Sequence, residues 1–284
     1  MTAATTSPTD LTLVLAATGK TGRRVADKLE ALGHAVRRGS RSAEIPFDWH
    51  DEATWAPALA GVTQVYLVYT PDLAVPSAPP AITKFTAMAK QSGARKIVLL
   101  SGRGEEEAQK CEQIVADSGV PFTVVRAGWF NQNFDEGHFL PMVLEGTIAL
   151  PAGPVAEPFI DADDIADVAV AALTQPGHDG ETYEVTGPRL MTFAEIAQEL
   201  ADAVGRPVRF VTITHDEFAA GLTEHDLDDE LIWLLNYLMT EVLDGRNAYV
   251  ADGVQRALGR APRDFRDYAQ QVAATGVWDA GVTA

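Results

Sequence analysis

The sequence predicts an α/β protein in which helices cover both faces of a doubly wound parallel sheet, followed by a small, mostly helical C-terminal substrate region. Two observations support this fold class. Short apolar runs alternate with helical patterns through the first half of the chain, and the alternation loosens after Ala127. Strands that alternate with helices are typical of βαβ units, in which crossover helices bury both faces of parallel strands.

The first unit begins with an apolar run at residues 11–15 and continues into a helical pattern that ends at Gly33. Between them lies a turn of small and polar residues: Ala16, Ala17, Thr18, Gly19, Lys20, Thr21 and Gly22. A helix N-terminus presents unpaired N–H groups and a positive dipole end, and small residues let a pyrophosphate approach the backbone. This stretch therefore predicts nucleotide binding, with an ordinary strand–helix turn as the alternative.

The turn has the spacing G-x-x-G-x-x-G, but Ala16 replaces the first glycine before Gly19 and Gly22. If residue 16 requires a positive φ, its methyl group crowds the turn, because L-residues other than glycine pay a steric cost there. We assign the cofactor to the six residues that follow, which are Ala17, Thr18, Gly19, Lys20, Thr21 and Gly22.

The end of the second predicted strand, residues 35–38, is basic. In dinucleotide-binding folds this position meets the adenosine ribose, where an acidic residue selects NAD by accepting hydrogen bonds from the 2′-hydroxyl. Here the position offers Arg38, Ser40 and Arg41, and guanidinium groups suit a 2′-phosphate. We therefore expect NADP(H) to be favoured over NAD(H), with a solvated basic loop as the alternative, above all for Arg37.

Four further strands are predicted at residues 45–49, 64–68, 96–100 and 122–125, and helices at residues 81–92 and 105–117. The carboxyl ends of these strands share the sheet edge of the glycine turn, where cofactors bind in open α/β sheets. The remaining candidates for cofactor binding are therefore Asp48, Tyr69, Thr70, Pro71 and Ser101. Asp48 has two interpretations: contact with the adenine amino group, or capping of a helix that begins near Glu52.

The second half of the chain is less regular and more helical. Extended segments are predicted at residues 148–151, 158–160 and 181–185, and helices at residues 165–173, 193–204, 215–222, 228–243, 254–257 and 265–272. We interpret the C-terminal part as a smaller, mostly helical cap and not as a separate domain.

Aromatic and amide side chains follow the strand predicted at residues 122–125. Trp129 and Phe130 would give an apolar substrate cleft, and Asn133 an amide that orients the substrate. Tyr237, on a later helix, is a further candidate for the lining. The alternatives are that Trp129 and Phe130 merely pack the two lobes of the protein, and that the helical stripe with Tyr237 is core.

The usual general acid for carbonyl reduction is missing. It is a tyrosine with a lysine four positions later, which lowers the pKa of the phenol, and none of the six tyrosines has one. Lys110 lies on the helix after residues 96–100, where that lysine belongs, with Glu106 at the tyrosine position. Lys110 is the catalytic candidate, and a solvated helix lysine is the alternative. We expect no metal, because the histidines are scattered, and no nucleophile elbow is present around Ser101.

Composition excludes several classes of function. A net charge of −18 leaves no basic patch to neutralise phosphates, so we expect no nucleic-acid partner. The single cysteine, Cys111, is interpreted as a small apolar helix residue. The first ten residues lack a signal-peptide pattern, and no apolar run reaches membrane length. We expect a cytoplasmic protein with a small-molecule substrate and no membrane partner, as a monomer or homodimer.

Four segments together carry a likeness to one family: residues 16–22, Ser40 with Arg41, residues 126–134 (RAGWFNQNF) and residues 158–166. They resemble the NmrA-like atypical short-chain dehydrogenases/reductases. The resemblance implies a Rossmann core at residues 1–126, with residues 127–284 adding the remaining core elements and the substrate-binding region in a single compact unit. It also implies an NADP-type cofactor, with Gly19 to Gly22 at the pyrophosphate and Arg41 at the 2′-phosphate. The chain departs from the family at Ala16 and in the missing Tyr/Lys pair.

The resemblance leaves two main classes of function open. Some members reduce quinones, azo dyes, imines or double bonds, whereas others bind the nucleotide as redox sensors and regulate a partner. We expect an NADPH-dependent reductase of a small conjugated or aromatic substrate (quinone, imine, enone or carbonyl). The alternative is a non-catalytic NADP(H)-binding regulator, and a minor one is a biosynthetic enzyme without hydride chemistry. The aromatic residues favour the enzyme, and the absent acid favours the regulator.

Overall fold

The computed structural model describes residues 10–224, 227 and 229–279. The first nine residues, which entered the signal-peptide argument, and Asp228, where one helix was predicted to begin, lie outside the described residues. The chain divides into two compact units. The described residues of the first unit are 10–127, Ala162–Val185 and Asp252–Arg260, and those of the second come from Gly128–Asp161, Thr186–Ala251 and 261–279.

The first unit contains a six-stranded sheet whose neighbouring strands are all parallel, in the order β2-β1-β3-β4-β5-β8. The strands are β1 (Leu11–Leu15), β2 (Ala35–Gly39), β3 (Gln64–Leu67), β4 (Lys96–Gly102), β5 (Phe122–Ala127) and β8 (Thr182–Val185). The strand order reverses between β1 and β3, so the crevice outside their carboxyl ends is the topological switch point where ligands bind in such sheets. The predicted doubly wound parallel sheet is confirmed.

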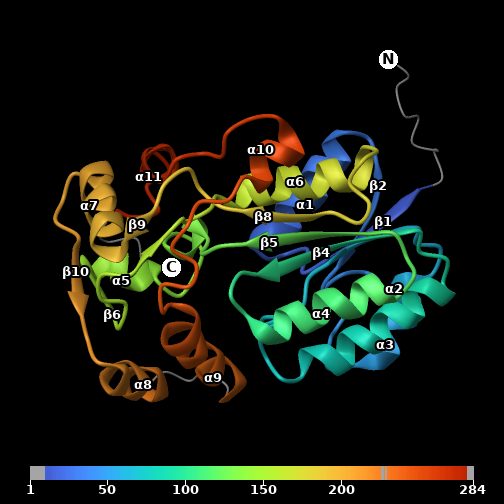
Figure 1. Ribbon diagram of the computed structural model, residues 1–284, viewed down its shortest axis with the longest axis horizontal. Helices are drawn as coiled ribbons and strands as arrows, with labels where there is room; N and C mark the ends of the chain where they lie inside the picture. Colours follow the sequence, from blue (N-terminus) through green and yellow to red (C-terminus); the bar gives the residue numbers. More distant parts are fainter. Residues whose placement is uncertain (1–9, 225–226, 228, 280–284) are drawn as a thin grey trace. The chain divides into compact units, whose positions relative to one another are not determined.

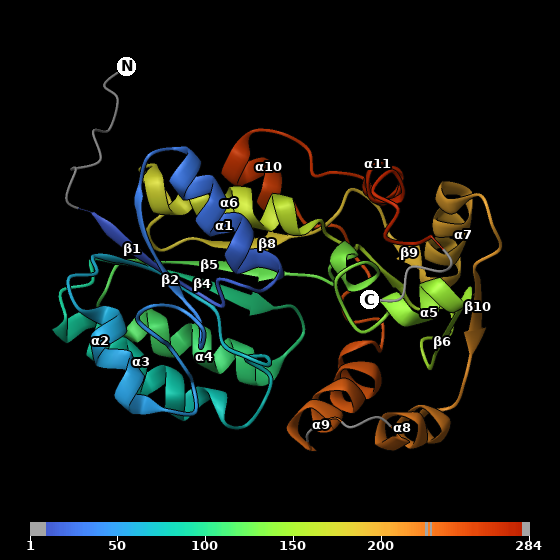
Figure 2. The same ribbon diagram turned by 180° about the vertical axis from the view of Figure 1, so that it is seen from behind.

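Helices cover both faces of this sheet (Figures 1 and 2). The helices α1 (Lys20–Ala31), α6 (Ala162–Thr174) and α10 (Gly253–Leu258) lie on one face, and α2 (Trp55–Leu59), α3 (Ala78–Gln91) and α4 (Glu106–Asp117) lie on the other. The α6 helix is buried along most of its length and consists largely of alanine and valine. Small side chains let it pack closely on the sheet and on α1.

The second unit has two short strand pairs with helices around an aromatic core. The β6 strand (Thr147–Leu150) pairs in parallel with β10 (Arg209–Thr212), and β7 (Ala156–Glu157) pairs antiparallel with β9 (Met191–Thr192). Its helices are α5 (Leu140–Glu145), α7 (Phe193–Val204), α8 (His215–Glu224), α9 (Asp229–Tyr237) and α11 (Phe265–Ala273), with a π-helical turn at Leu238–Val242. The sequence prediction missed α5, β7, β9 and β10, which are short.

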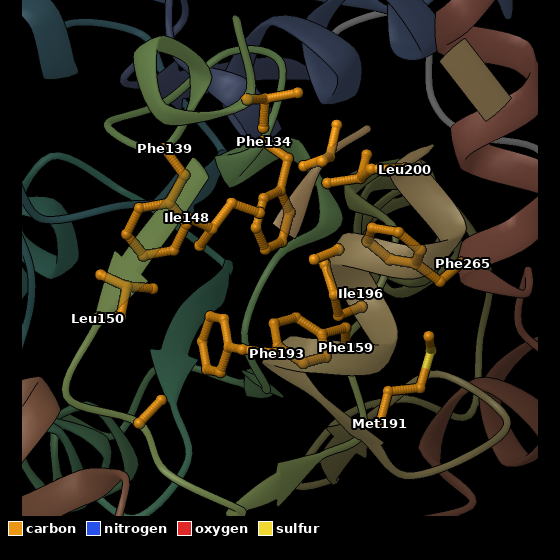
Figure 3. Close-up of a cluster of buried hydrophobic side chains, with 14 of the residues drawn as sticks. Phe134, Phe139, Ile148, Leu150, Phe159, Met191, Phe193, Ile196, Leu200 and Phe265 are labelled. Atoms are coloured by element: carbon orange, nitrogen blue, oxygen red, sulfur yellow. The ribbon is translucent and has the colours of Figure 1, made fainter. Parts of the chain in front are cut away.

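Phe193 is the centre of the aromatic core of the second unit (Figure 3). It is fully buried, and its ring lies 5.2 Å from that of Phe159 in an edge-to-face arrangement. Phe134 and Phe139 pack on the same ring at 6.4 and 6.2 Å between centroids. Thr192 caps the helix that Phe193 begins, in a reciprocal capping box with Glu195. The cap and the aromatic packing therefore fix α7 at the same point.

The strand predicted at residues 45–49 is absent. Its backbone makes only an isolated bridge between Asp48 and Asp51, whereas Phe47 and Trp49 are buried. The rings of these two residues pack edge-to-face on each other at 5.0 Å and against Phe85 of α3. The aromatic pattern that predicted a strand thus reflects side chains packed under a loop.

Candidate functional site

The glycine turn connects β1 to α1 as predicted. The helix begins at Lys20 with Gly19 as its N-cap, and the N–H of Gly19 donates to the carbonyl of Ala16 at 2.8 Å. No side chain caps this N-terminus, and its first turn holds no acidic residue. The first N–H groups of a helix have no acceptor within the helix, so this end is suited to an anion.

Gly22 allows the helix to approach the strand closely. A Cβ atom on Gly22 would overlap the carbonyl oxygen of Ala16, would lie 2.6 Å from its carbonyl carbon and 2.7 Å from the carbonyl oxygen of Leu15. Real Cβ atoms do not approach backbone this closely. Only glycine therefore fits at this position, as expected for the last glycine of a dinucleotide-binding turn, which lets the helix pack closely against the strand.

Ala16 has a positive φ of 50°, the conformation in which a methyl group was expected to crowd the turn. Among the described residues, it is the one non-glycine residue with positive φ. The left-handed conformation costs an L-residue roughly 1–2 kcal/mol. The turn nevertheless keeps its hydrogen bonds, including that from the N–H of Ala17 to the carbonyl of Gly39 at 3.1 Å. The strain is therefore local.

The three arginines at the end of β2 have different environments. The Arg37 guanidinium donates to the carbonyls of Ala58 and Ala60 and so caps the end of α2, in place of the solvated position considered for it. Arg38 binds Glu30 of α1 in a bidentate pair at 3.0 and 2.7 Å and also contacts Asp27. Both side chains are engaged by the fold.

Arg41 is the arginine of the three whose guanidinium is available to bind a ligand. It is exposed, and within the described part of the chain its guanidinium forms no hydrogen bond or ion pair. Its neighbour Ser40 lies with Oγ 3.4 Å from Oγ of Ser42 and is half-buried. Of the predicted 2′-phosphate ligands, Arg41 and Ser40 keep side chains that can turn toward a ligand, whereas Arg38 is held on α1.

The candidates near the end of β3 form a packed loop. Tyr69 is buried, its hydroxyl donates to Oγ of Ser77 at 3.2 Å, and its ring lies 4.8 Å from that of Trp49. Thr70 and Pro71 are exposed and joined by a cis peptide bond. Tyr69 therefore packs on the buried side of the loop, whereas Thr70 and Pro71 lie on its exposed side.

Asp48 does not cap a helix. Its Oδ1 accepts from the N–H of His50 at 3.0 Å, whereas the N-cap of the 3₁₀ turn at Glu52–Thr54 is Asp51, which accepts from the N–H of Ala53 at 3.1 Å. The capping interpretation of Asp48 is therefore wrong. Contact with the adenine stays a prediction.

Ser101, at the end of β4, belongs to a buried ionic network. Its hydroxyl donates to Glu112 of α4 at 2.6 Å, and Glu112 accepts two hydrogen bonds from Arg126 of β5. Arg126 also reaches Glu184 of β8 at 3.2 Å. The network joins four elements behind the carboxyl edge of the sheet and holds the Ser101 hydroxyl in one orientation.

Two carboxyl groups at this edge escaped the sequence analysis. Asp72 lies in the loop after β3, and Glu105 precedes α4 in the loop after β4. Burial raises the pKa of both carboxyl groups, and the negative charge of Asp72 adds to the rise at Glu105. Their positions just beyond two strand ends are the signal that could have found them.

The substrate candidates lie in the second unit. Trp129 is half-buried, stacked on Phe139 at 6.4 Å and edge-to-face on Phe193 at 6.1 Å. Phe130 precedes the 3₁₀ turn at Asn131–Asn133, Asn133 is the last residue of that turn, and both are half-buried. Tyr237 of α9 stacks on Trp233 instead, with centroids 5.1 Å apart and planes at 7°. The first three are thus adjacent, and Tyr237 belongs to a separate aromatic pair.

Asn131 is an amide that the sequence analysis did not select. It is fully buried, and neither its amide nitrogen nor its amide oxygen has a hydrogen-bond partner among the described residues. Buried polar groups are nearly always paired, so Asn131 marks a place where a water molecule or another polar group is expected.

Lys110 lies on the outer face of α4. The side chain is exposed and forms an ion pair with Glu107, which raises the pKa of the Lys110 ammonium. A higher pKa makes the ammonium a weaker acid, so this environment is that of a surface lysine. Cys111, beside it, is buried, and burial raises the pKa of its thiol to about 12, which agrees with an inert apolar role.

Within residues 10–224, 227 and 229–279, no helix is both long and apolar enough to cross a membrane. The same residues contain no cluster of three or more histidine, cysteine, aspartate or glutamate side chains that could hold a metal ion.

Comparison with known proteins gives a family and several relatives. A family model described as NAD(P)H-binding matches residues 16–176. The prestalk A differentiation protein A of Dictyostelium discoideum is 31% identical over 254 residues, which are 89% of this chain and 82% of that protein. The NAD(P)H azoreductase of Xenophilus azovorans is 34% identical over 237 residues, 80% of this chain and 81% of the azoreductase.

Solved structures share the fold. A nucleoside-diphosphate-sugar epimerase from Staphylococcus aureus has a TM-score of 0.78 at 18% identity and covers 92% of this chain and 99% of its own. The Escherichia coli NADPH-dependent quinone oxidoreductase, complexed with NADPH, has a TM-score of 0.74 at 23% identity, with coverages of 92% and 99%. NmrA, a negative transcriptional regulator, in complex with NADP, has a TM-score of 0.72 at 16% identity, with coverages of 97% and 99%.

The close approach at Gly22 predicts a large effect of a single methyl group. We expect Gly22→Ala to destabilise the protein by about 1–3 kcal/mol, as overpacking against fixed backbone does. Gly221→Ala in α8, where an added Cβ meets nothing within 4 Å, should instead gain up to about 1 kcal/mol from helix propensity. Urea unfolding of both variants checks this, and equal stabilities would contradict the close approach.

The positive φ of Ala16 predicts that glycine is tolerated there. In Ala16→Gly, relief of about 1–2 kcal/mol of left-handed strain should outweigh the roughly 0.4–1 kcal/mol of entropy that glycine adds to the unfolded chain. The matched control is Ala17→Gly, which removes a buried methyl at ordinary φ and should cost about 1 kcal/mol. Equal losses in the two thermal melts would show that residue 16 is unstrained.

Proposed function

Because the chain belongs to the NAD(P)H-binding family and has the fold of the NmrA-like atypical short-chain dehydrogenases/reductases, we propose that it is an NADPH-dependent oxidoreductase. It reduces a small conjugated or aromatic acceptor such as a quinone, imine, enone or carbonyl compound. The observation that carries the proposal is the uncapped N-terminus of α1, which the close approach at Gly22 brings to the carboxyl end of β1.

Arg41 supports the choice of NADPH over NADH. The β2 strand ends at Gly39 without an acidic residue, and the exposed Arg41 guanidinium follows two positions later. A guanidinium binds a 2′-phosphate through charge-assisted hydrogen bonds. Its hydrogen bond to the neutral 2′-hydroxyl of NADH is much weaker. With Arg37 and Arg38 held by the fold, Arg41 carries this selectivity, assisted by Ser40.

We assign different parts of the cofactor to different residues at the carboxyl edge of the sheet. When bound, the nicotinamide cofactor supplies a hydride. Gly19 to Gly22 hold its pyrophosphate, and Asp48, Tyr69, Thr70, Pro71 and Ser101 are the proposed ligands of the rest of the nucleotide. In the second unit, Trp129 and Phe130 offer the half-buried aromatic surface that a flat acceptor requires. Asn133 and Tyr237 are the proposed polar contacts to the substrate.

Two named relatives support an oxidoreductase function. The azoreductase that is 34% identical to this chain acts, by its name, on azo compounds. The agroclavine dehydrogenase of Claviceps fusiformis is 32% identical over 90% of this chain. We do not assign the proton donor to Lys110, because its ammonium is exposed and paired with Glu107.

A second candidate function is a nucleotide-binding regulator without turnover. It is favoured by the missing Tyr/Lys pair and by the likeness in fold to NmrA, a transcriptional regulator that binds NADP. The two candidates share the nucleotide site and differ only in whether NADPH is consumed.

Arg41→Ala tests the nucleotide site. Calorimetric titration should show NADPH binding that weakens about 10- to 100-fold in Arg41→Ala, since charged hydrogen bonds contribute roughly 1.5–3 kcal/mol, with NADH affinity nearly unchanged. Arg38→Ala is the control, because that guanidinium is already paired with Glu30, and it should leave the preference intact. Absence of binding to either nucleotide would remove both candidate functions.

An acceptor screen separates the enzyme from the regulator. We expect the purified protein to consume NADPH with at least one acceptor from a panel of quinones, enones, azo dyes and imines, followed by the loss of NADPH absorbance. Trp129→Ala should raise KM for that acceptor, because it removes aromatic contact area, and leave NADPH affinity unchanged. NADPH binding with no consumption across the panel would favour the regulator.

A further inference from the structure

The negative charge of the chain is concentrated in the second unit. The segments that form this unit contain 20 aspartates and glutamates, six arginines and no lysine, whereas those of the first unit contain 20 acidic and 16 basic residues. The second unit therefore carries a charge of −14 out of the −18 of the whole chain. A field of this sign attracts cations and repels anions.

The arginines of the second unit are engaged by the fold. Each has a hydrogen-bonded or ion-paired partner among the described residues, which is a carboxylate, a backbone carbonyl or a hydroxyl group. They are Arg189, Arg206, Arg209, Arg246, Arg263 and Arg266. An anionic acceptor would have to compete with these partners for a guanidinium.

The aromatic substrate candidates lie on stretches without lysine or arginine. Residues 127–188, which include Trp129 and Phe130, contain neither residue type, and the same holds for residues 210–245, which include Tyr237. The face of an aromatic ring is negative and attracts a cation that lies over it. Ring faces and carboxylates in these stretches therefore favour the same sign of ligand charge.

The α9 helix carries an exposed aromatic pair next to carboxylates. Trp233 is 41% exposed and stacks on Tyr237 with planes at 7°. Residues four apart lie side by side on a helix, so Asp229, Trp233 and Tyr237 share one face of α9. Asp229 is exposed, and so is Glu241, which lies four residues after Tyr237 in the π-helical turn. This surface has the flat rings and the negative charge that a planar cation requires.

A cationic acceptor also removes the need for a proton donor. Hydride addition to a neutral carbonyl group leaves a negative charge on oxygen that an acid must neutralise, and the chain lacks the Tyr/Lys pair. At a C=N⁺ group, the carbon accepts the hydride of NADPH and forms a C–H bond, while the π electron pair moves to nitrogen. The products are a neutral amine and NADP⁺, and no proton is taken up or released.

We propose that the substrate is a planar aromatic cation with an electrophilic C=N⁺ bond, an aryl iminium ion, and that it binds on the α9 surface of Trp233 and Tyr237. This inference rests on the proposed function and selects one class among its acceptors. The two rings bind the cation through their faces, and Asp229 and Glu241 attract it as neighbouring charges. A neutral quinone lacks this attraction, and an anionic one is repelled.

A binding experiment tests the surface without turnover. N-methylquinolinium is a flat aromatic cation, and quinoline is its neutral counterpart at about pH 8. In calorimetric titrations with NADP⁺ present, which has no hydride to transfer, the cation should bind more tightly than quinoline. Trp233→Leu keeps an apolar side chain but removes the ring, and it should weaken binding of the cation about 3- to 30-fold and that of quinoline much less.

The matched control for this titration is Tyr249→Leu, which removes another exposed aromatic ring of the second unit. It should leave the affinity for N-methylquinolinium unchanged. Equal affinities of the wild type for the cation and for quinoline would overturn the inference, as would an unchanged affinity for the cation in Trp233→Leu.

The kinetic experiment compares three acceptors at saturating NADPH. An N-methyl dihydroisoquinolinium salt is cationic, naphthoquinone is neutral, and naphthoquinone sulfonate is anionic. After correction for the reaction without protein, kcat/KM should be highest for the cation and lowest for the sulfonate. Added salt should lower kcat/KM for the cation and raise it for the sulfonate, because it screens the charge of the second unit. A sulfonate reduced as well as the cation would contradict the inference.

Charge-removing variants locate the attraction. Asp229→Asn and Glu241→Gln should each raise KM for the cation about 2- to 5-fold, as exposed charges do, and leave kcat and the KM for naphthoquinone unchanged. Asp202→Asn removes the same charge from an exposed position on α7 and is the control. Equal effects of the three variants would contradict binding at α9. A wild type that binds NADPH but reduces none of the three acceptors would instead remove the proposed function, and the titration with N-methylquinolinium would still test the surface.

Discussion

The first helix of the sheet unit can begin only where the backbone of Ala16 passes Gly22. The carbonyl oxygen of Ala16 lies so close to the Cα of Gly22 that a methyl group on residue 22 would overlap it. This contact brings the N-terminus of α1 to the carboxyl end of β1, and the parallel order of the other strands then lines up their own carboxyl ends along the same edge. The candidate site is the consequence of that alignment, because its residues are far apart along the chain.

Most of the first unit could be predicted from its sequence, because apolar runs buried on both faces of a parallel sheet leave a strong pattern. The prediction failed at residues 45–49, where Phe47 and Trp49 pack on Phe85 through their side chains and not through a strand. The pattern shows that such residues are buried but not what their backbone does. The second unit was harder, because β6, β7, β9 and β10 are each at most four residues long.

The candidate site was predictable in its backbone and less so in its side chains. The glycine turn and Arg41 follow from local sequence, whereas the engagement of Arg38 by Glu30 depends on how α1 lies beside β2. Asp72 and Glu105 come from different loops, and the pairing of β3 with β4 brings these loops to the same edge of the sheet. A pattern along one chain segment carries no information on such a meeting. The likeness to a known family supplied fold and cofactor class but no proton donor.

The three arginines at the end of β2 and just after it have different environments, and this difference affects which substitutions the protein tolerates. Arg37 and Arg38 are bound into the fold, so substitutions there disturb α2 or α1. Arg41 contributes no side-chain hydrogen bond to the described structure, so mutation can exchange it at little cost to folding. Cofactor preference in this scaffold is therefore an evolvable trait: a lineage, or a protein engineer, can alter it one codon at a time without first acquiring stabilising mutations.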